Sequence, residues 1–287
     1  MLPFPQYFPQ YKGDYIVNKR IVGTTLLVAA AAILAFTALP AAGQDEDGAP
    51  KAKGKAAKAK AKSAPTPRTA DGKVDFTGIW SADRTFIYDI QESLTPGETL
   101  PLQPWALKTA QERMSKDDPE ALCLPTGVPR QAPYPWRIMQ NKDMMFFLFE
   151  GNIHSYRQIF LDNPKHPDNW NPNWYGHSSA KWEGDTLVID SVGFNDKFWF
   201  DFAGHPHTEQ LHVIERFRRP DFDHIEYDTT IDDPGAYTKP FVMHGKSNYS
   251  YNTELMEFIC NENNKDIDHI VGKDPRNHYA TDGKGKQ

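Results

Sequence analysis

The sequence predicts an all-β protein, built as an antiparallel up-and-down barrel or a strongly curved sheet with one short helix. Many short segments between residues 76 and 260 are rich in β-branched and aromatic residues, as strands are. Several of them are joined by very short turns, such as Glu183-Gly184-Asp185, and short turns join antiparallel neighbours. Only one segment of the chain shows helical spacing.

Eight to ten strands are expected, from ten candidate segments. These span residues 76–80, 136–140, 144–150, 154–161, 178–183, 186–192, 211–218, 224–231, 241–251 and 254–260. The helix is expected over residues 104–115, because Pro104 suits a first helical position and Leu107 and Ala110 follow at helical spacing. Residues 124–136 contain four prolines and are expected to be extended coil packed against the sheet.

One carboxylate is expected on an apolar face of the sheet. Alternation along its strand puts Glu215 on the same face as Val213 and Phe217. Such a group is either tuned for proton transfer or paired with an arginine inside the wall, Arg157 or Arg218.

The N-terminal region, residues 1–43, is expected to be a leader that contains a secretory signal. Lys19 and Arg20 precede an apolar run over residues 21–38, and small residues follow, which is the order of a signal peptide. Translation is expected to start near Val17, and the mature protein to be periplasmic or secreted. The alternative is an inner-membrane anchor through residues 21–38, since this run is close to the length of a spanning helix.

The leader is followed by a linker and one domain. Residues 44–70 are dominated by Lys, Ala and Pro and cannot bury enough apolar surface to fold, so we expect a disordered tether. Its lysines could also contact an anionic envelope surface. A single β-barrel-like domain is expected over residues 71–280, before a disordered tail at 281–287.

The charge of the folded region disfavours nucleic acid as a partner. Residues 71–287 hold 22 Lys and Arg against 34 Asp and Glu, a net charge of −12. A region this acidic repels a phosphate backbone.

The chain has two cysteines, Cys123 and Cys260. In an exported protein such a pair is expected to form one disulfide bond. The alternative is two buried free thiols. We favour the bridge because Cys123 precedes the main run of strands and Cys260 ends the last candidate strand.

Several motifs of the expected domain carry a family resemblance. DFTGIW at 75–80 is similar to the Gly-x-Trp entry strand of lipocalin-like barrels. Longer motifs are CLPTGVPR (123–130), GHSSAKWEGDTLVIDSVGFND (176–196), AGHPHTEQLHVIERFRR (203–219) and TIDDPGAYTKPF (230–241). Together they resemble a family of secreted bacterial proteins with a lipocalin-like or calycin-like β-barrel. The likeness covers residues 78–264 and implies export and a barrel, but no particular reaction, so no catalytic role is transferred.

The loop that follows the strand ending at residue 192 is the expected ligand site. Its aromatic rings alternate too little for all of them to be buried on one face, so some should line a pocket. The residues expected to bind the ligand are Phe194, Asn195, Trp199, Asp201 and His205. The sequence therefore predicts an exported β-barrel that binds a small apolar or aromatic molecule. The polar anchors of its pocket are expected to be His177, His205, His207 and Glu215.

An enzyme on the same scaffold is the alternative: a hydrolase, lyase or isomerase with a His/Asp pair. His177 or His207 would be the general base, oriented by a carboxylate such as Asp190, Asp201 or Glu215. Structural ion pairs produce the same pattern of residues. A third hypothesis is an envelope-associated structural protein held by the lysine-rich linker.

No cofactor is predicted, and a divalent metal ion is the one alternative considered. Its ligands would be His205, His207 and His212, since His205 and His207 stand two residues apart and could face one side of a strand or turn. The competing interpretation is a set of hydrogen-bonded histidines that orders the loop. Neither an HExxH motif nor a Gly-rich nucleotide loop is present in the sequence.

Overall fold

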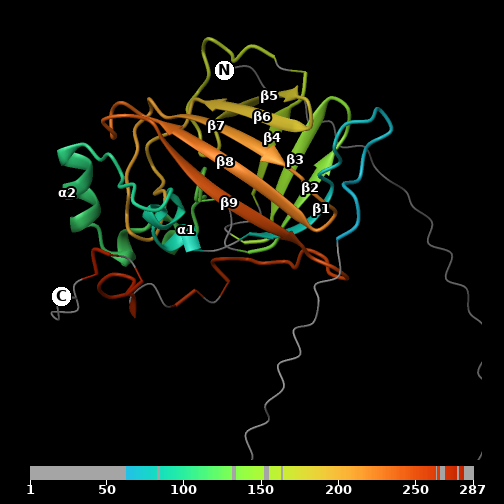
Figure 1. Cartoon of the computed structure of the whole chain (residues 1–287). Coiled ribbons are helices and arrows are strands. Elements are labelled where there is room, and N and C mark those ends of the chain that lie inside the picture. Colours follow the sequence, from blue (N-terminus) through green and yellow to red (C-terminus); the bar gives the residue numbers. More distant parts are fainter. Residues whose placement is uncertain are drawn as a thin grey trace, which may run out of the picture. The chain divides into compact units, whose positions relative to one another are not determined.

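The expected all-β barrel is confirmed. The computed structural model describes residues 63–82, 85–130, 134–151, 155–162, 164–262, 264–265, 269–276 and 278–280. In these residues nine strands follow one another in chain order around a closed barrel (Figure 1). The strands are β1 (Gly78–Ala82), β2 (Trp136–Gln140), β3 (Met144–Phe149), β4 (Tyr156–Phe160), β5 (His177–Glu183), β6 (Thr186–Val192), β7 (His212–Arg218), β8 (His224–Asp232) and β9 (Phe241–Tyr249).

The described residues also contain short helical segments. They are the α-helices α1 (Thr85–Tyr88) and α2 (Pro104–Glu112) and the 3₁₀ turns η1 (Ile90–Ser93), η2 (Ser115–Asp117) and η3 (Pro119–Leu122). The helix expected at 104–115 is α2, which starts with Pro104 and ends before Arg113, whose backbone is extended. In the part of the chain that the structure describes, no helix is long and apolar enough to cross a membrane.

One pair of neighbouring strands departs from the expected antiparallel pattern. β4 and β5 run parallel, with Ile159 opposite Ser178 and Phe160 opposite Ser179. The other neighbouring strands pair antiparallel. The connection over residues 161–176 is long enough to carry the chain back along the barrel, which a parallel pairing requires.

The prediction of a strand at residues 254–260 is wrong, because this segment is irregular chain. β1 already pairs with both β2 and β9 and closes the barrel, so no sheet edge is left for another strand at this point. The segment is held instead by side chains: the ring of Phe258 lies 5.8 Å from that of Tyr134, centroid to centroid.

The described residues begin before the expected domain border, at Ser63, inside the range expected to be a linker. Arg68 of this segment makes two hydrogen bonds to the carboxylate of Asp185, of 2.9 and 2.7 Å. A planar guanidinium matched to both oxygens of a carboxylate fixes an orientation, which ties the segment to the β5–β6 turn. The leader, the linker up to residue 62 and the tail at 281–287 lie outside the described residues.

Buried apolar side chains form two clusters. The first fills the barrel and includes Trp80, Phe147 and Phe217. The second joins Phe86 of α1 to rings of the loop between β6 and β7, including Phe198. Some rings of that loop were expected to line a pocket; Phe194, Phe198 and Phe200 are core residues, whereas Phe202 is only partly buried and lines a surface hollow.

The expected disulfide bond is present between Cys123 and Cys260. The two Cα atoms are 5.5 Å apart, and 137 positions separate the residues in the sequence. The bond fixes the chain that follows β9 to the end of η3, although that chain forms no strand.

Candidate functional site

The polar side chains expected to meet at one pocket lie in separate environments. They are His177, His205, His207 and Glu215, and each has its own set of partners. The structure does contain a cluster of histidine and aspartate side chains, but only His205 of these four belongs to it.

Glu215 is the acid of a buried ion pair. Its Oε2 lies 2.5 Å from Nη2 of Arg157, and both side chains are 1% exposed. Arg157 also donates to the hydroxyls of Ser178 and Ser191, at 3.1 and 2.8 Å. This is the arginine pair that the sequence offered as the alternative to a catalytic carboxylate.

Asp190, on β6, joins two histidines. Its Oδ1 lies 2.9 Å from Nε2 of His212 and 3.1 Å from Nε2 of His166, whose Nδ1 is 2.8 Å from Nδ1 of His177. The hydrogen bond with Asp190 raises the pKa of His212, and the same contact lowers the pKa of Asp190. Burial and the neighbouring His166 lower the pKa of His177. Asp190 therefore orients His166 and His212, and reaches His177 only through His166.

His207 is a buried, neutral histidine. Its ring lies 3.9 Å from that of Phe198 and 5.0 Å from that of Phe200, centroid to centroid. Burial lowers the pKa of His207 to about 4. Its Nδ1 donates to the carbonyl of Thr208 at 3.3 Å. Neither His207 nor His212 lies with His205, so the three histidines proposed as metal ligands are not brought together.

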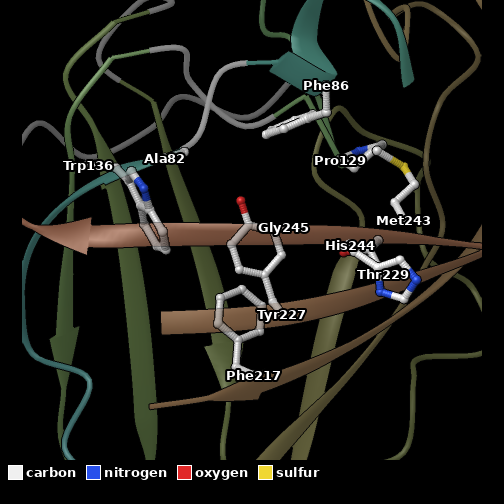
Figure 2. Close-up of a pocket in the computed structure, with 10 residues that line it drawn as sticks. All are labelled: Ala82, Phe86, Pro129, Trp136, Phe217, Tyr227, Thr229, Met243, His244 and Gly245. Carbon is white, nitrogen blue, oxygen red and sulfur yellow. The ribbon is translucent and has the colours of Figure 1, made fainter. Parts of the chain in front are cut away.

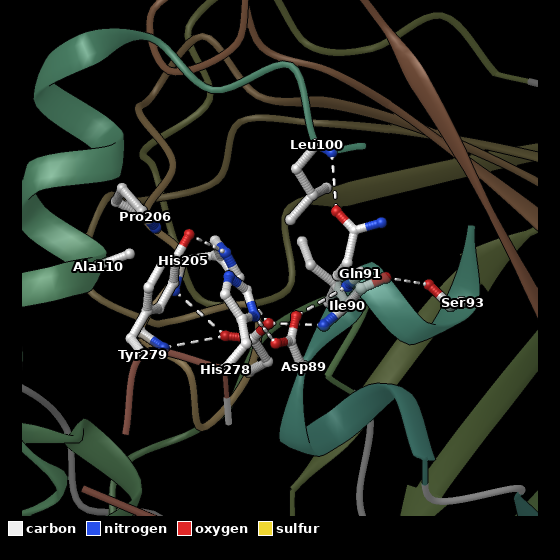
Figure 3. Close-up of polar contacts among 12 residues, drawn as sticks. Asp89, Ile90, Gln91, Ser93, Leu100, Ala110, His205, Pro206, His278 and Tyr279 are labelled. Carbon is white, nitrogen blue, oxygen red and sulfur yellow. Dashed lines mark hydrogen bonds and ion pairs between the residues drawn. The ribbon is translucent and has the colours of Figure 1, made fainter. Parts of the chain in front are cut away.

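His205 belongs to a buried cluster with Asp89 and Asp201. Its Nδ1 lies 2.6 Å from Oδ2 of Asp201, and its Nε2 lies 3.2 Å from the hydroxyl of Tyr279. Asp89 contacts Nδ1 of His278. Figure 3 shows Asp89, His205, His278 and Tyr279 close together between α2 and the η1 segment. The sequence suggested Asp201 and His205 as site residues, whereas Asp89 follows no pattern that marks it.

The other residues expected to bind a ligand are held by the protein itself. Phe194 is fully buried, and Trp199 is 5% exposed beneath the guanidinium of Arg113, 4.6 Å from the ring centre. Asn195 accepts the backbone N–H of Lys197 at 3.1 Å through its side chain. In this structure these residues order the loop between β6 and β7.

An apolar cavity lies at the mouth of the barrel, outside the expected site (Figure 2). Its lining residues are Ala82, Phe86, Pro129, Trp136, Phe217, Tyr227, Thr229, Met243, His244 and Gly245. Figure 2 shows the Tyr227 ring stacked on Phe217, with its hydroxyl pointing toward the space between Trp136 and Phe86. The empty space is about 430 Å³, part of it open to solvent, and the centre of a water molecule fits in only about 20 Å³ of it.

The cavity lies beside an incomplete seam in the barrel wall. β8 pairs with β9 from Phe241 to Asn248, whereas β1 pairs only with Ser247, Asn248 and Tyr249. A surface hollow lies on the middle of β9, with an empty space of about 780 Å³ that includes open solvent, and shares Phe86, His244 and Gly245 with the cavity. Phe86 of α1 therefore stands between the hollow and the barrel interior.

Sequence reasoning missed this cavity because its lining comes from distant elements. Phe86, Trp136 and Met243 belong to α1, β2 and β9, and only the pairing of the strands brings them together. The local signals are those of alternation, which puts Phe217 on the apolar face of its strand and Tyr227 on one face of β8 with Ile225 and Ile231.

Comparison with known proteins returns no matching family model, no similar curated protein and no similar solved structure. The resemblance to a family of secreted barrel proteins therefore stays a prediction from the motifs.

Proposed function

We propose that this protein binds a small apolar or aromatic molecule in the cavity at the mouth of its barrel. The observation that carries the proposal is the lining of this cavity: the rings of Phe86, Trp136, Phe217 and Tyr227 surround it together with the thioether of Met243. Aromatic and apolar walls with a few polar groups are the usual composition of small-molecule sites.

Entry of a ligand requires a movement of Phe86. In the closed arrangement, the space left for the centre of a water molecule is about 20 Å³, which suits a single water rather than an aromatic ring. Phe86 lies on a helix of only four residues, and its ring lines both the cavity and the hollow outside it. Rotation of this one side chain would join the two spaces.

Polar groups near the cavity favour a ligand that can form a hydrogen bond. Ser247 lies on the same face of β9 as Gly245 and pairs with Ala82 of β1. Gly245 and Ala82 both line the cavity, so Ser247 lies beside it. Its buried hydroxyl has no hydrogen-bond partner among the described residues. A buried hydroxyl without a partner costs about 1–3 kcal/mol, so a ligand or water that reaches it gains stability.

The protein is also proposed to act after export. The signal-like order of residues 17–43 supports this, and so does the disulfide bond between Cys123 and Cys260, since such bonds persist in oxidising compartments. N-terminal sequencing of the mature protein from a periplasmic fraction tests it. A mature chain that begins near residue 44 supports export, and a chain retained whole in the cytoplasm overturns it.

The binding proposal is tested with a neutral aromatic fluorophore, N-phenyl-1-naphthylamine, titrated into the folded protein. Saturable binding is expected for the wild type. Ala82→Leu, which fills the cavity from β1, should weaken it by about tenfold or more, or about 1.4 kcal/mol. Phe86→Ala should strengthen it, because the truncated side chain no longer closes the seam.

A matched control separates this cavity from other apolar surfaces. Met256 is 68% exposed and lines a different surface hollow, so Met256→Ala should leave binding unchanged. Absence of saturable binding to the wild type, or equal binding by the Ala82→Leu variant with the circular dichroism of the folded protein, would overturn the proposal.

A further inference from the structure

We propose that Asp89, Asp201 and His205 form a binding site for one divalent transition-metal ion, at the end of the barrel near α2. One ligand atom from each residue lies within 4.8 Å of the other two. This site is distinct from the cavity at the barrel mouth, whose lining includes none of the three.

The three side chains are buried together. Asp89 is 2% exposed, and Asp201 and His205 are fully buried. Two carboxylates in one dry volume repel each other and need positive charge between them. A divalent ion between the two carboxylates supplies that charge at one point.

Backbone hydrogen bonds hold both carboxylates in place and leave one position on each for a cation. Asp201 Oδ1 accepts the N–H groups of Gly204 and His205, at 3.0 and 3.1 Å. Its Oδ2 accepts the N–H of Ile90 at 2.7 Å and has its second lone pair toward the imidazole of His205. An ion between Oδ2 and the imidazole would replace the proton that these two groups share.

Asp89 is held in the same way from the other side. Its Oδ1 accepts the N–H of Gln91 at 2.9 Å, as the cap of η1, and its Oδ2 faces His278. The backbone of η1 and the loop at 201–205 thus fix two carboxylate oxygens before any ion arrives. Preorganised ligands of this kind reduce the entropy that metal binding costs.

The chain near its C-terminus supplies two hydrogen-bond partners at the border of the cluster, His278 and Tyr279. His278 contacts Asp89, and the hydroxyl of Tyr279 lies 3.2 Å from Nε2 of His205. A metal-bound imidazole commonly keeps its other nitrogen in a hydrogen bond, and Tyr279 provides that partner when Nδ1 of His205 binds the ion.

The mixed donor set selects the class of ion. Imidazole nitrogen suits Zn²⁺, Fe²⁺ and Cu²⁺, while carboxylate oxygen alone suits Mg²⁺ and Ca²⁺. One nitrogen with two carboxylates therefore favours Zn²⁺ or Co²⁺ over Mg²⁺. Arg113 and Arg130 both interact with the charge of Asp201, but Arg130 is also paired with Asp118 and Glu120, which reduces its repulsion of a cation.

Titration of chelator-treated protein with Co²⁺ tests the site, because the visible absorption of Co²⁺ reports its ligands directly. One ion per chain is expected, with the bands of a low-coordinate nitrogen–oxygen site that Zn²⁺ displaces and Mg²⁺ does not. Asp89→Asn keeps the cap on Gln91 through its amide oxygen and removes one charge. It should weaken Co²⁺ binding by about a hundredfold or more, since the loss of an outer-shell partner alone costs about 10–100-fold.

Asp190→Asn is the matched control, since Asp190 also contacts histidines but lies outside the proposed site. It should bind Co²⁺ as the wild type does. Absence of one-to-one binding to the folded wild type would overturn the proposal, and so would loss of the bands in Asp190→Asn with retention in Asp89→Asn. His278→Gln, on a half-exposed position, gives a second variant should Asp89→Asn not fold; unchanged bands and at least a threefold weaker affinity are expected, and an unchanged affinity would contradict the role given to Asp89.

Discussion

Replacing Glu215 with Gln distinguishes a structural carboxylate from a catalytic one. Glu215 and Arg157 are each 1% exposed, so Gln would leave the guanidinium buried with neutral acceptors alone, namely the new amide oxygen and the hydroxyls of Ser178 and Ser191. Removing one partner of a buried ion pair costs about 3–5 kcal/mol. A free-energy difference of about 1.4 kcal/mol changes an equilibrium constant tenfold. Glu215→Gln should therefore raise the ratio of unfolded to folded protein by about two to four powers of ten.

Chemical denaturation followed by tryptophan fluorescence measures this difference in the free energy of unfolding. An exposed pair is the control: Glu183 and Arg216 are each 41% exposed, and Glu183→Gln should cost less than about 1 kcal/mol. The double replacement Arg157→Met with Glu215→Leu should recover most of the loss, because it leaves no buried charge. A Glu215→Gln variant as stable as the wild type, or more stable, would refute the reasoning and favour a catalytic carboxylate that strains the fold.

Three further outcomes are expected. Replacing Cys123 and Cys260 with Ser should lower the free energy of unfolding by about 5 kcal/mol, since the bond closes a loop of 137 residues. A loss below about 1 kcal/mol would show that the bond does not restrict the unfolded chain. The pKa of His212 is raised by its hydrogen bond with Asp190, so their contact stabilises the fold below the unfolded value of about 6.5 and this contribution is lost as pH rises through the higher folded-state pKa. Asp190→Asn should thus lower the melting temperature more at about pH 5.5 than at about pH 9, and an equal change at both would contradict the assignment. Phe86→Ala should cost about 3–5 kcal/mol as a buried ring is lost, and a neutral aromatic ligand should restore part of it; no rise in melting temperature with ligand would argue against an opened cavity.

The strands were predictable because their signals are local. Alternation along β7 placed Glu215 inward with Val213 and Phe217, and all three are buried. The segment at 254–260 has similar local character but forms no strand, since closure of the barrel between β1 and β9 depends on the whole sheet. Strand propensity indicates which segments can pair, but it does not indicate whether the sheet still has an unpaired edge strand for them to join.

The sites were less predictable because side chains meet through tertiary contacts. His205 and His207 are two residues apart, yet one bonds to Asp201 and the other packs between phenylalanines. The partner that completes the buried cluster, Asp89, comes from a segment more than a hundred residues earlier. Some of the crowded rings in the loop after β6 were expected to line a pocket; most of its phenylalanines are core, and Phe202 lines a surface hollow.

The most direct test of ligand binding at the barrel mouth is methyl NMR of protein labelled at its methionines. Met243 lines the cavity, whereas Met139 and Met256 are 51% and 68% exposed on other surfaces. Titration with N-phenyl-1-naphthylamine should shift the methyl signal of Met243 saturably, with the affinity found by fluorescence, and leave the signals of Met139 and Met256 in place. A Met243 signal that does not move while the fluorophore binds would contradict the proposed site.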